Sequence, residues 1–103
     1  MIDYKAIISK YCAGNTELLH ILLTHSRQVA DRALTILAAH PEWVESGEVD
    51  PVFVEEAAML HDIGVVLCDA PKIHCLGTHA YIEHGYLGAE ILRQEGLPKH
   101  AQV

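Results

Sequence analysis

Residues 57–64 read Ala57-Ala58-Met59-Leu60-His61-Asp62-Ile63-Gly64. Small and apolar residues lead into an adjacent histidine and aspartate, and the pattern predicts a packed helix that ends at Gly64, where glycine is a common terminator. In the last turn of a helix a carboxylate meets the negative end of the helix dipole, so an unpaired Asp62 is mildly unfavourable there. A bound cation removes that conflict. His61 and Asp62 are therefore candidate metal ligands, the alternative being a solvated acid at a helix end.

Helical periodicity and its punctuation predict an all-α chain around this stretch. The expected helices span residues 3–13, from the cap Asn15 to about Ala39, 51–64 and 81–95, and another begins at Leu97-Pro98. The acidic segment 40–50 is expected to be a surface connection, and Asp50-Pro51 is a cap followed by proline at the first helical position. Residues 65–80 show no clear period and are expected to form a long loop, which in compact domains is usually functional or mobile.

Three histidines are expected to face the interior from three different helices. At about 100° per residue, His25 lies on the stripe that its helix must bury. That stripe also carries Leu18, Leu22, Val29 and Ile36. His61 and His84 align with small or apolar residues in the same way. A lone inward histidine is more often a core imidazole bonded to a backbone carbonyl, but three of them beside Asp62 favour a shared metal site.

Composition and charge limit the possible functions. The 103 residues, 50% of them apolar, suffice for one domain with a modest core. A formal charge of −7 opposes non-specific binding to nucleic acid or anionic lipid. No apolar stretch approaches the ~18 residues of a membrane span, and the start lacks signal-peptide character. Three cysteines without close pairing argue against a disulfide framework. We therefore expect a cytoplasmic protein without a membrane or nucleic-acid-duplex partner.

Residues 57–64 resemble the HDIG signature of the HD-domain metal-dependent phosphohydrolase superfamily, and the chain looks most similar to small stand-alone members. Thr24-His25-Ser26-Arg27-Gln28-Val29-Ala30 is similar to the segment of the family's first metal-binding histidine, and the segment from His84 to Leu92 resembles a downstream histidine motif. The resemblance covers roughly residues 18–103. It implies one HD-like helical bundle over residues 1–103, without the family's C-terminal helices. The apolar faces left exposed on residues 81–103 then predict a homo-oligomer.

By this resemblance His25, His61 and Asp62 are metal ligands, and His84 is a further ligand or a phosphate contact. Mixed nitrogen and oxygen donors suit one or two divalent transition metal ions per site (Fe, Mn, Ni, Co or Zn), with Mg less well matched to imidazole. The implied activity is metal-dependent hydrolysis of a nucleotide or related phosphoester. Asp62 would then both ligate the metal and accept a proton from the attacking water.

Two departures from the family pattern bear on catalysis. Val65 stands where many members have a lysine that can contact phosphate, and no residue matches the family's last aspartate ligand. Arg27 and Lys72 are left as candidate phosphate contacts, although each is more often a solvated charge. The departures favour the alternative function, a non-catalytic helical module that binds a metal or a nucleotide. They also suggest that the chain is a fragment, or that water, substrate or a partner completes the site.

The expected loop allows a second metal hypothesis. It carries Cys68, His74, Cys75 and His79, which are zinc-ligand residue types. Their spacing matches no CxxC-type pattern, so a loop that covers the site is the favoured interpretation.

Overall fold

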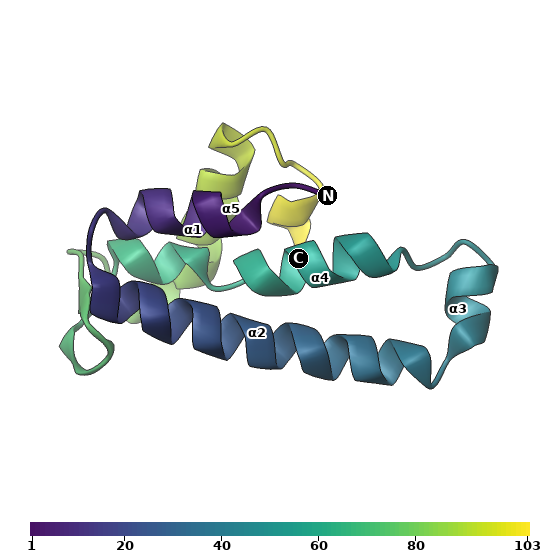
Figure 1. Ribbon diagram of the computed structural model, residues 1–103. Coiled ribbons are helices and arrows are strands. Elements are labelled where there is room, and N and C mark those ends of the chain that lie inside the picture. The colour runs from purple at the N-terminus through teal and green to yellow at the C-terminus, as the bar shows by residue number, and fades with distance from the viewer.

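The long helix α2 (Thr16–Ala38) organises the molecule, and a computed structural model describes all 103 residues around it. α1 (Tyr4–Cys12) and α4 (Pro51–Leu60) lie along α2, and the short α3 (Pro41–Glu45) joins α2 to α4 at one end (Figure 1). α5 (His84–Gln94) packs towards the other end. The helices confirm the all-α prediction, since the strands comprise two residues each. No helix is both long enough and apolar enough to cross a membrane.

The helix starts follow the capping residues of the sequence. The Asn15 side chain accepts a hydrogen bond from the Leu18 amide at 3.2 Å, and Asp50 accepts one from the Val52 amide at 3.0 Å. Each bond satisfies an amide that has no partner within its helix. The expected starts of α2 and α4 are therefore confirmed.

Two expected boundaries are wrong. The segment 40–50 is not a plain connection, because Pro41–Glu45 form α3. α4 ends at Leu60 rather than at Gly64, since the backbone of Asp62 (φ −107°, ψ 13°) leaves the α-helical region and a 3₁₀ helix, η1 (Ile63–Leu67), follows. Asp62 consequently lies at a bend between two helices.

The expected long loop is an ordered small motif. Two short strands, β1 (Asp69–Ala70) and β2 (Cys75–Leu76), pair antiparallel around the 3₁₀ turn η2 (Pro71–Ile73). The prediction of a long loop over residues 65–80 is therefore wrong: each strand is too short for an alternating pattern, and the strand pairing depends on backbone hydrogen bonds.

The C-terminal elements also differ in detail from the expected helices. The 3₁₀ turn η3 (Tyr81–Glu83) precedes α5, so the α-helix begins at His84. The last expected helix is only the 3₁₀ turn η4 (His100–Gln102).

The buried face of α2 is shifted by about one residue from the expected stripe. Its buried residues are Leu18, Leu22, Ser26, Ala30 and Leu37. Ile36 is 46% exposed, and the His25 side chain is 52% exposed. The expectation that His25 points into the core is therefore wrong: it lies at the edge of the packed face, where α1 and α4 cover its neighbours and leave it accessible.

Gly64 lets η1 touch the backbone of α5. A Cβ atom at Gly64 would lie 1.9 Å from the His84 carbonyl oxygen and 2.5 Å from the Gly88 amide nitrogen. These are backbone atoms, so no side chain can rotate away to make room. The contact brings the start of α5, with His84, next to the end of α4.

We expect Gly64→Ala to lower the free energy of unfolding by about 3 kcal/mol, because the added methyl overpacks a backbone contact. The matched control is Gly85→Ala, whose Cβ would meet nothing within 4 Å. It should leave stability unchanged or raise it by about 0.5 kcal/mol, since alanine favours helix. Chemical denaturation measures both, and equal stability of the two variants would contradict the packing account.

Candidate metal centre

Three imidazoles surround the carboxylate of Asp62. The Nε2 atoms of His61 and His25 lie 3.0 Å and 3.1 Å from Asp62 Oδ2. The Nε2 atom of His84 lies 3.4 Å from the other oxygen, Oδ1. The His25 and His61 rings are tilted against each other with centroids 5.5 Å apart. The structure thus brings together all four residues for which the sequence predicts metal contact.

Each of these residues comes from a different place in the fold. His25 projects from the edge of α2, His61 follows the last residue of α4, and His84 is the first residue of α5. Asp62 occupies the bend between α4 and η1. The close contact of Gly64 with α5 therefore holds the His84 end of the cluster against the His61-Asp62 end.

Backbone carbonyls orient two of the imidazoles. His61 Nδ1 lies 2.6 Å from the Ala58 carbonyl oxygen, and His84 Nδ1 lies 2.7 Å from the Tyr81 carbonyl oxygen. Each Nδ1–H donates to its carbonyl, which directs Nε2 towards Asp62, where it can bind a metal when unprotonated or donate to the carboxylate when protonated. Metal-binding histidines are usually held this way, with the second nitrogen bonded to a carbonyl or carboxylate.

Protons or a cation must stabilise this arrangement. An Nε2 lone pair that faces a carboxylate oxygen at 3.0–3.4 Å is repulsive unless a positive charge lies between them. The hydrogen bond and charge of Asp62 raise the pKa of His61, although burial opposes the shift. The hydrogen bond from His61, followed by the charges of His61, His25 and His84, lowers the pKa of Asp62 against its burial. Asp62 is therefore a carboxylate at neutral pH.

The donor set fits a divalent metal ion. One ligand atom each from His25, His61 and Asp62 lies within 4.8 Å of the others. His84 is outside that group of three but faces the second carboxylate oxygen. Two or three imidazole nitrogens with a carboxylate suit first-row transition metals better than magnesium.

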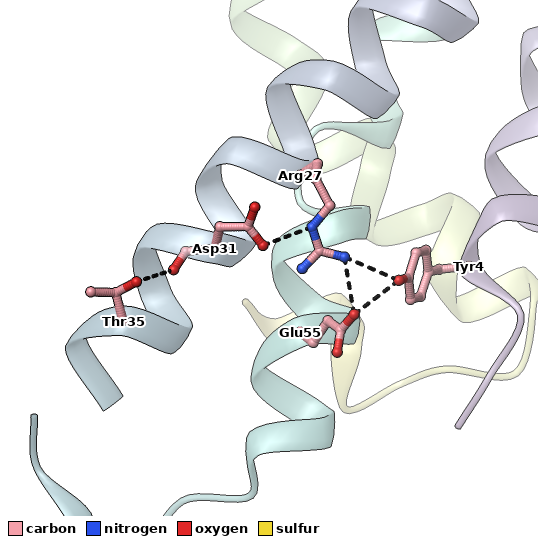
Figure 2. Close-up of polar contacts among 5 residues, drawn as sticks. All are labelled: Tyr4, Arg27, Asp31, Thr35 and Glu55. Atoms are coloured by element: carbon pink, nitrogen blue, oxygen red, sulfur yellow. Dashed lines mark hydrogen bonds and ion pairs between the residues drawn. The ribbon is translucent and has the colours of Figure 1, made fainter. Parts of the chain in front are cut away.

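Arg27 has strong partners of its own (Figure 2). Its guanidinium donates to Glu55 at 3.0 Å, to Asp31 at 2.9 Å and to the Tyr4 hydroxyl at 3.3 Å. The bond from Arg27 also lowers the pKa of Glu55, with the bond from Tyr4 contributing next. This network ties α1, α2 and α4 together, and a contact of Arg27 with substrate stays a prediction.

Lys72 is exposed in η2. Its neighbour Ile73 lines a pocket that also contains His25 and Asp62. The lysine therefore flanks the candidate metal centre without lining it.

The cysteines and histidines of residues 68–79 do not form a second metal cluster. Cys68 and Cys75 are fully buried, and desolvation raises the pKa of both thiols, which keeps them protonated. His79 pairs with Glu83 at 3.1 Å. The two thiols donate instead to backbone carbonyls, Cys68 to those of Gly64 and Ala80 and Cys75 to that of Ile73.

Tyr81 is a site residue that the sequence analysis did not single out. Its carbonyl holds His84, and its ring stacks on the His84 ring with centroids 4.6 Å apart. The sequence did offer one signal for Tyr81, its position three residues before the candidate ligand His84. At the start of a helix, that spacing places the Tyr81 carbonyl within reach of the His84 imidazole.

Comparison with known families agrees with this geometry. The family model of the HD domain matches residues 22–102. The chain therefore belongs to the HD domain family, whose members are in general metal-dependent phosphohydrolases and bind divalent metals. No curated protein and no solved structure matches the chain.

We expect affinity for Zn²⁺ or Ni²⁺ to fall as the pH is lowered from about 8 to about 5.5, because protons compete for the imidazole nitrogens. The raised pKa of His61 means that competition begins above the ordinary histidine value of 6.5. Below that range each displaced proton costs about tenfold in affinity per pH unit. Calorimetric titration at several pH values measures the effect.

His25→Ala tests the same site at constant pH and should weaken metal binding at least about tenfold. The matched control is His20→Ala, which removes an exposed histidine from the same helix. An affinity that is independent of pH, or equal losses in the two variants, would contradict the assignment.

Proposed function

We propose that this chain is a metal-dependent hydrolase of a small phosphoester, either a nucleotide or a related compound. The observation that carries the proposal is the convergence of three imidazole Nε2 atoms on Asp62, at 3.0–3.4 Å. Bonds to the carbonyls of Ala58 and Tyr81 fix two of the rings for ligation. One divalent cation between these nitrogens and the carboxylate would satisfy all of them, whereas without it His61 and His84 must each carry a second proton to bond Asp62.

The charge and position of each residue suggest its role in hydrolysis. His25, His61 and Asp62 would hold the metal, and His84 would be a further ligand or a phosphate contact. When bound, the metal would lower the pKa of a water and neutralise charge on the phosphoryl oxygens. Asp62 stays deprotonated at neutral pH because its pKa is lowered, so one carboxylate oxygen can accept a proton from the attacking water.

Access to the centre is through His25. Its side chain is 52% exposed, whereas those of His61 and His84 are 26% exposed. A phosphoester would therefore approach from the α2 side. Lys72 lies on the flank of this opening, and we propose it as a phosphate contact. Arg27 is the second candidate, but it would have to break its hydrogen bonds to Glu55 and Asp31 before it could contact a phosphate.

The alternative is a non-catalytic module that binds a metal or a nucleotide. One observation favours it: neither lysine nor arginine lines the pocket that contains His25 and Asp62. Phosphoryl-transfer enzymes commonly use such cations to stabilise the transition state.

Hydrolysis assays separate the two functions. The chain loaded with Mn²⁺, Ni²⁺, Co²⁺, Fe²⁺ or Zn²⁺ should hydrolyse generic phosphomonoesters or phosphodiesters, and Asp62→Ala should lower the rate at least about 100-fold, since it removes a ligand and a proton acceptor. Asp69→Ala, which removes an exposed aspartate from β1, is the matched control and should retain activity. Metal bound by the chain without turnover of any substrate would reject the hydrolase and favour the module.

A further inference from the structure

We infer that the pocket beside the metal centre binds an uncharged, apolar group of about one aromatic ring, carried by the same molecule as the phosphate. The inference rests on the proposed function, because the pocket is a substrate subsite only if the adjoining centre binds a phosphoryl group. The expected substrate is therefore a phosphoester with an apolar organic part. A substrate with further phosphates or other charges in this pocket is not expected.

The pocket opens directly onto the candidate ligands. His25 and Asp62 form its polar end. The rest of the wall is apolar or aromatic and comprises Leu18, Ile21, Leu22, Val65, Ile73 and Tyr81. These residues come from α2, η1, η2 and η3, so the small strand motif and its flanking 3₁₀ turns close the pocket. A phosphoryl group at the ligands would therefore direct its ester substituent along an apolar wall.

The size of the pocket limits the substituent. Its volume is about 250 Å³. A cavity of ~150 Å³ suffices to bind benzene, whereas pockets for drug-sized ligands begin at about 300 Å³. One ring with a small substituent fits these limits, and a bulkier group would extend into solvent.

Charge opposes a second anionic group in this space. Asp62 is the only charged residue of the pocket wall apart from any charge on His25. The nearest arginine on α2, Arg27, is bonded to Glu55 and Asp31, and it lines a different hollow with Lys5 and Gln28. A further phosphate placed in the pocket would have to lose water without gaining a cationic partner, which is costly.

Tyr81 gives the pocket an aromatic wall. Its ring stacks on His84 at 4.6 Å between centroids, and 49% of the residue is exposed. No hydrogen bond engages its hydroxyl group. A planar group in the pocket can cover this exposed ring, which adds apolar burial next to the ligands.

Phosphonates test the pocket without turnover, because their carbon–phosphorus bond replaces the scissile ester bond. The probes are phenylphosphonate and methylphosphonate, titrated calorimetrically into the Mn²⁺-loaded chain. They share one charged group and differ by the ring. We expect phenylphosphonate to bind about tenfold more tightly, from burial of the ring against the apolar wall.

Ile21→Ser should bring the ratio of the affinities for phenylphosphonate and methylphosphonate down towards one, because it replaces part of the apolar pocket wall with a hydroxyl group. Ile36→Ser is the matched control: it makes the same change on the same helix, at a residue that is 46% exposed and outside the pocket, and should keep the full preference. The wild-type comparison decides the question even if Ile21→Ser fails to fold.

Equal affinity of the wild-type chain for the two phosphonates, with hydrolysis of generic phosphoesters intact, would overturn the pocket inference and leave the proposed function standing. Loss of the preference in Ile36→Ser as large as in Ile21→Ser would also overturn the inference. Failure of the metal-loaded chain to bind either phosphonate would overturn the inference and count against the proposed function as well.

Discussion

The contact between Gly64 and the backbone of α5 is the constraint on which the site depends. A Cβ atom at Gly64 would meet the His84 carbonyl oxygen at 1.9 Å, so only glycine allows η1 and α5 to approach this closely. Gly64 thus positions the start of α5, with the candidate ligand His84, against His61-Asp62, and it does not end the preceding helix, which stops at Leu60. It couples fold stability to the geometry of the candidate ligands, because the same contact packs η1 on α5 and sets the position of His84.

The sequence predicted the parts of the fold that depend on local interactions. The caps at Asn15 and Asp50, the breaks near Gly14 and Gly96, and the all-α class follow from hydrogen bonds or backbone freedom within a few residues. The short strands could not be predicted, because they rest on pairing between backbone groups. The end of α4 was missed because tertiary packing, and not the helix itself, decides where the chain bends.

The candidate site was predictable in its members but not in its surroundings. His25, His61, Asp62 and His84 meet as expected, although His25 does so from an exposed edge of α2. Helical periodicity locates the buried face of a helix to within about one residue. That accuracy suffices to predict which side chains lie near a site, but not whether a given side chain is buried. The partners of Arg27 and the pocket wall from η2 and η3 depend on long-range packing. Self-association through residues 81–103 stays a prediction.

The central claim is that the imidazoles of His25 and His61 hold one metal site with Asp62, and that His84 is a further ligand or a phosphate contact. Nitrogen-15 NMR of the histidine rings during Zn²⁺ titration tests it most directly, because the ring-nitrogen shifts report protonation and metal binding at each histidine. We expect the Nε2 signals of His25 and His61, and of His84 where it ligates, to move on metal binding, while those of the other five of the eight histidines do not. Saturable shifts at His74 and His79, with His25 and His61 unchanged, would contradict it.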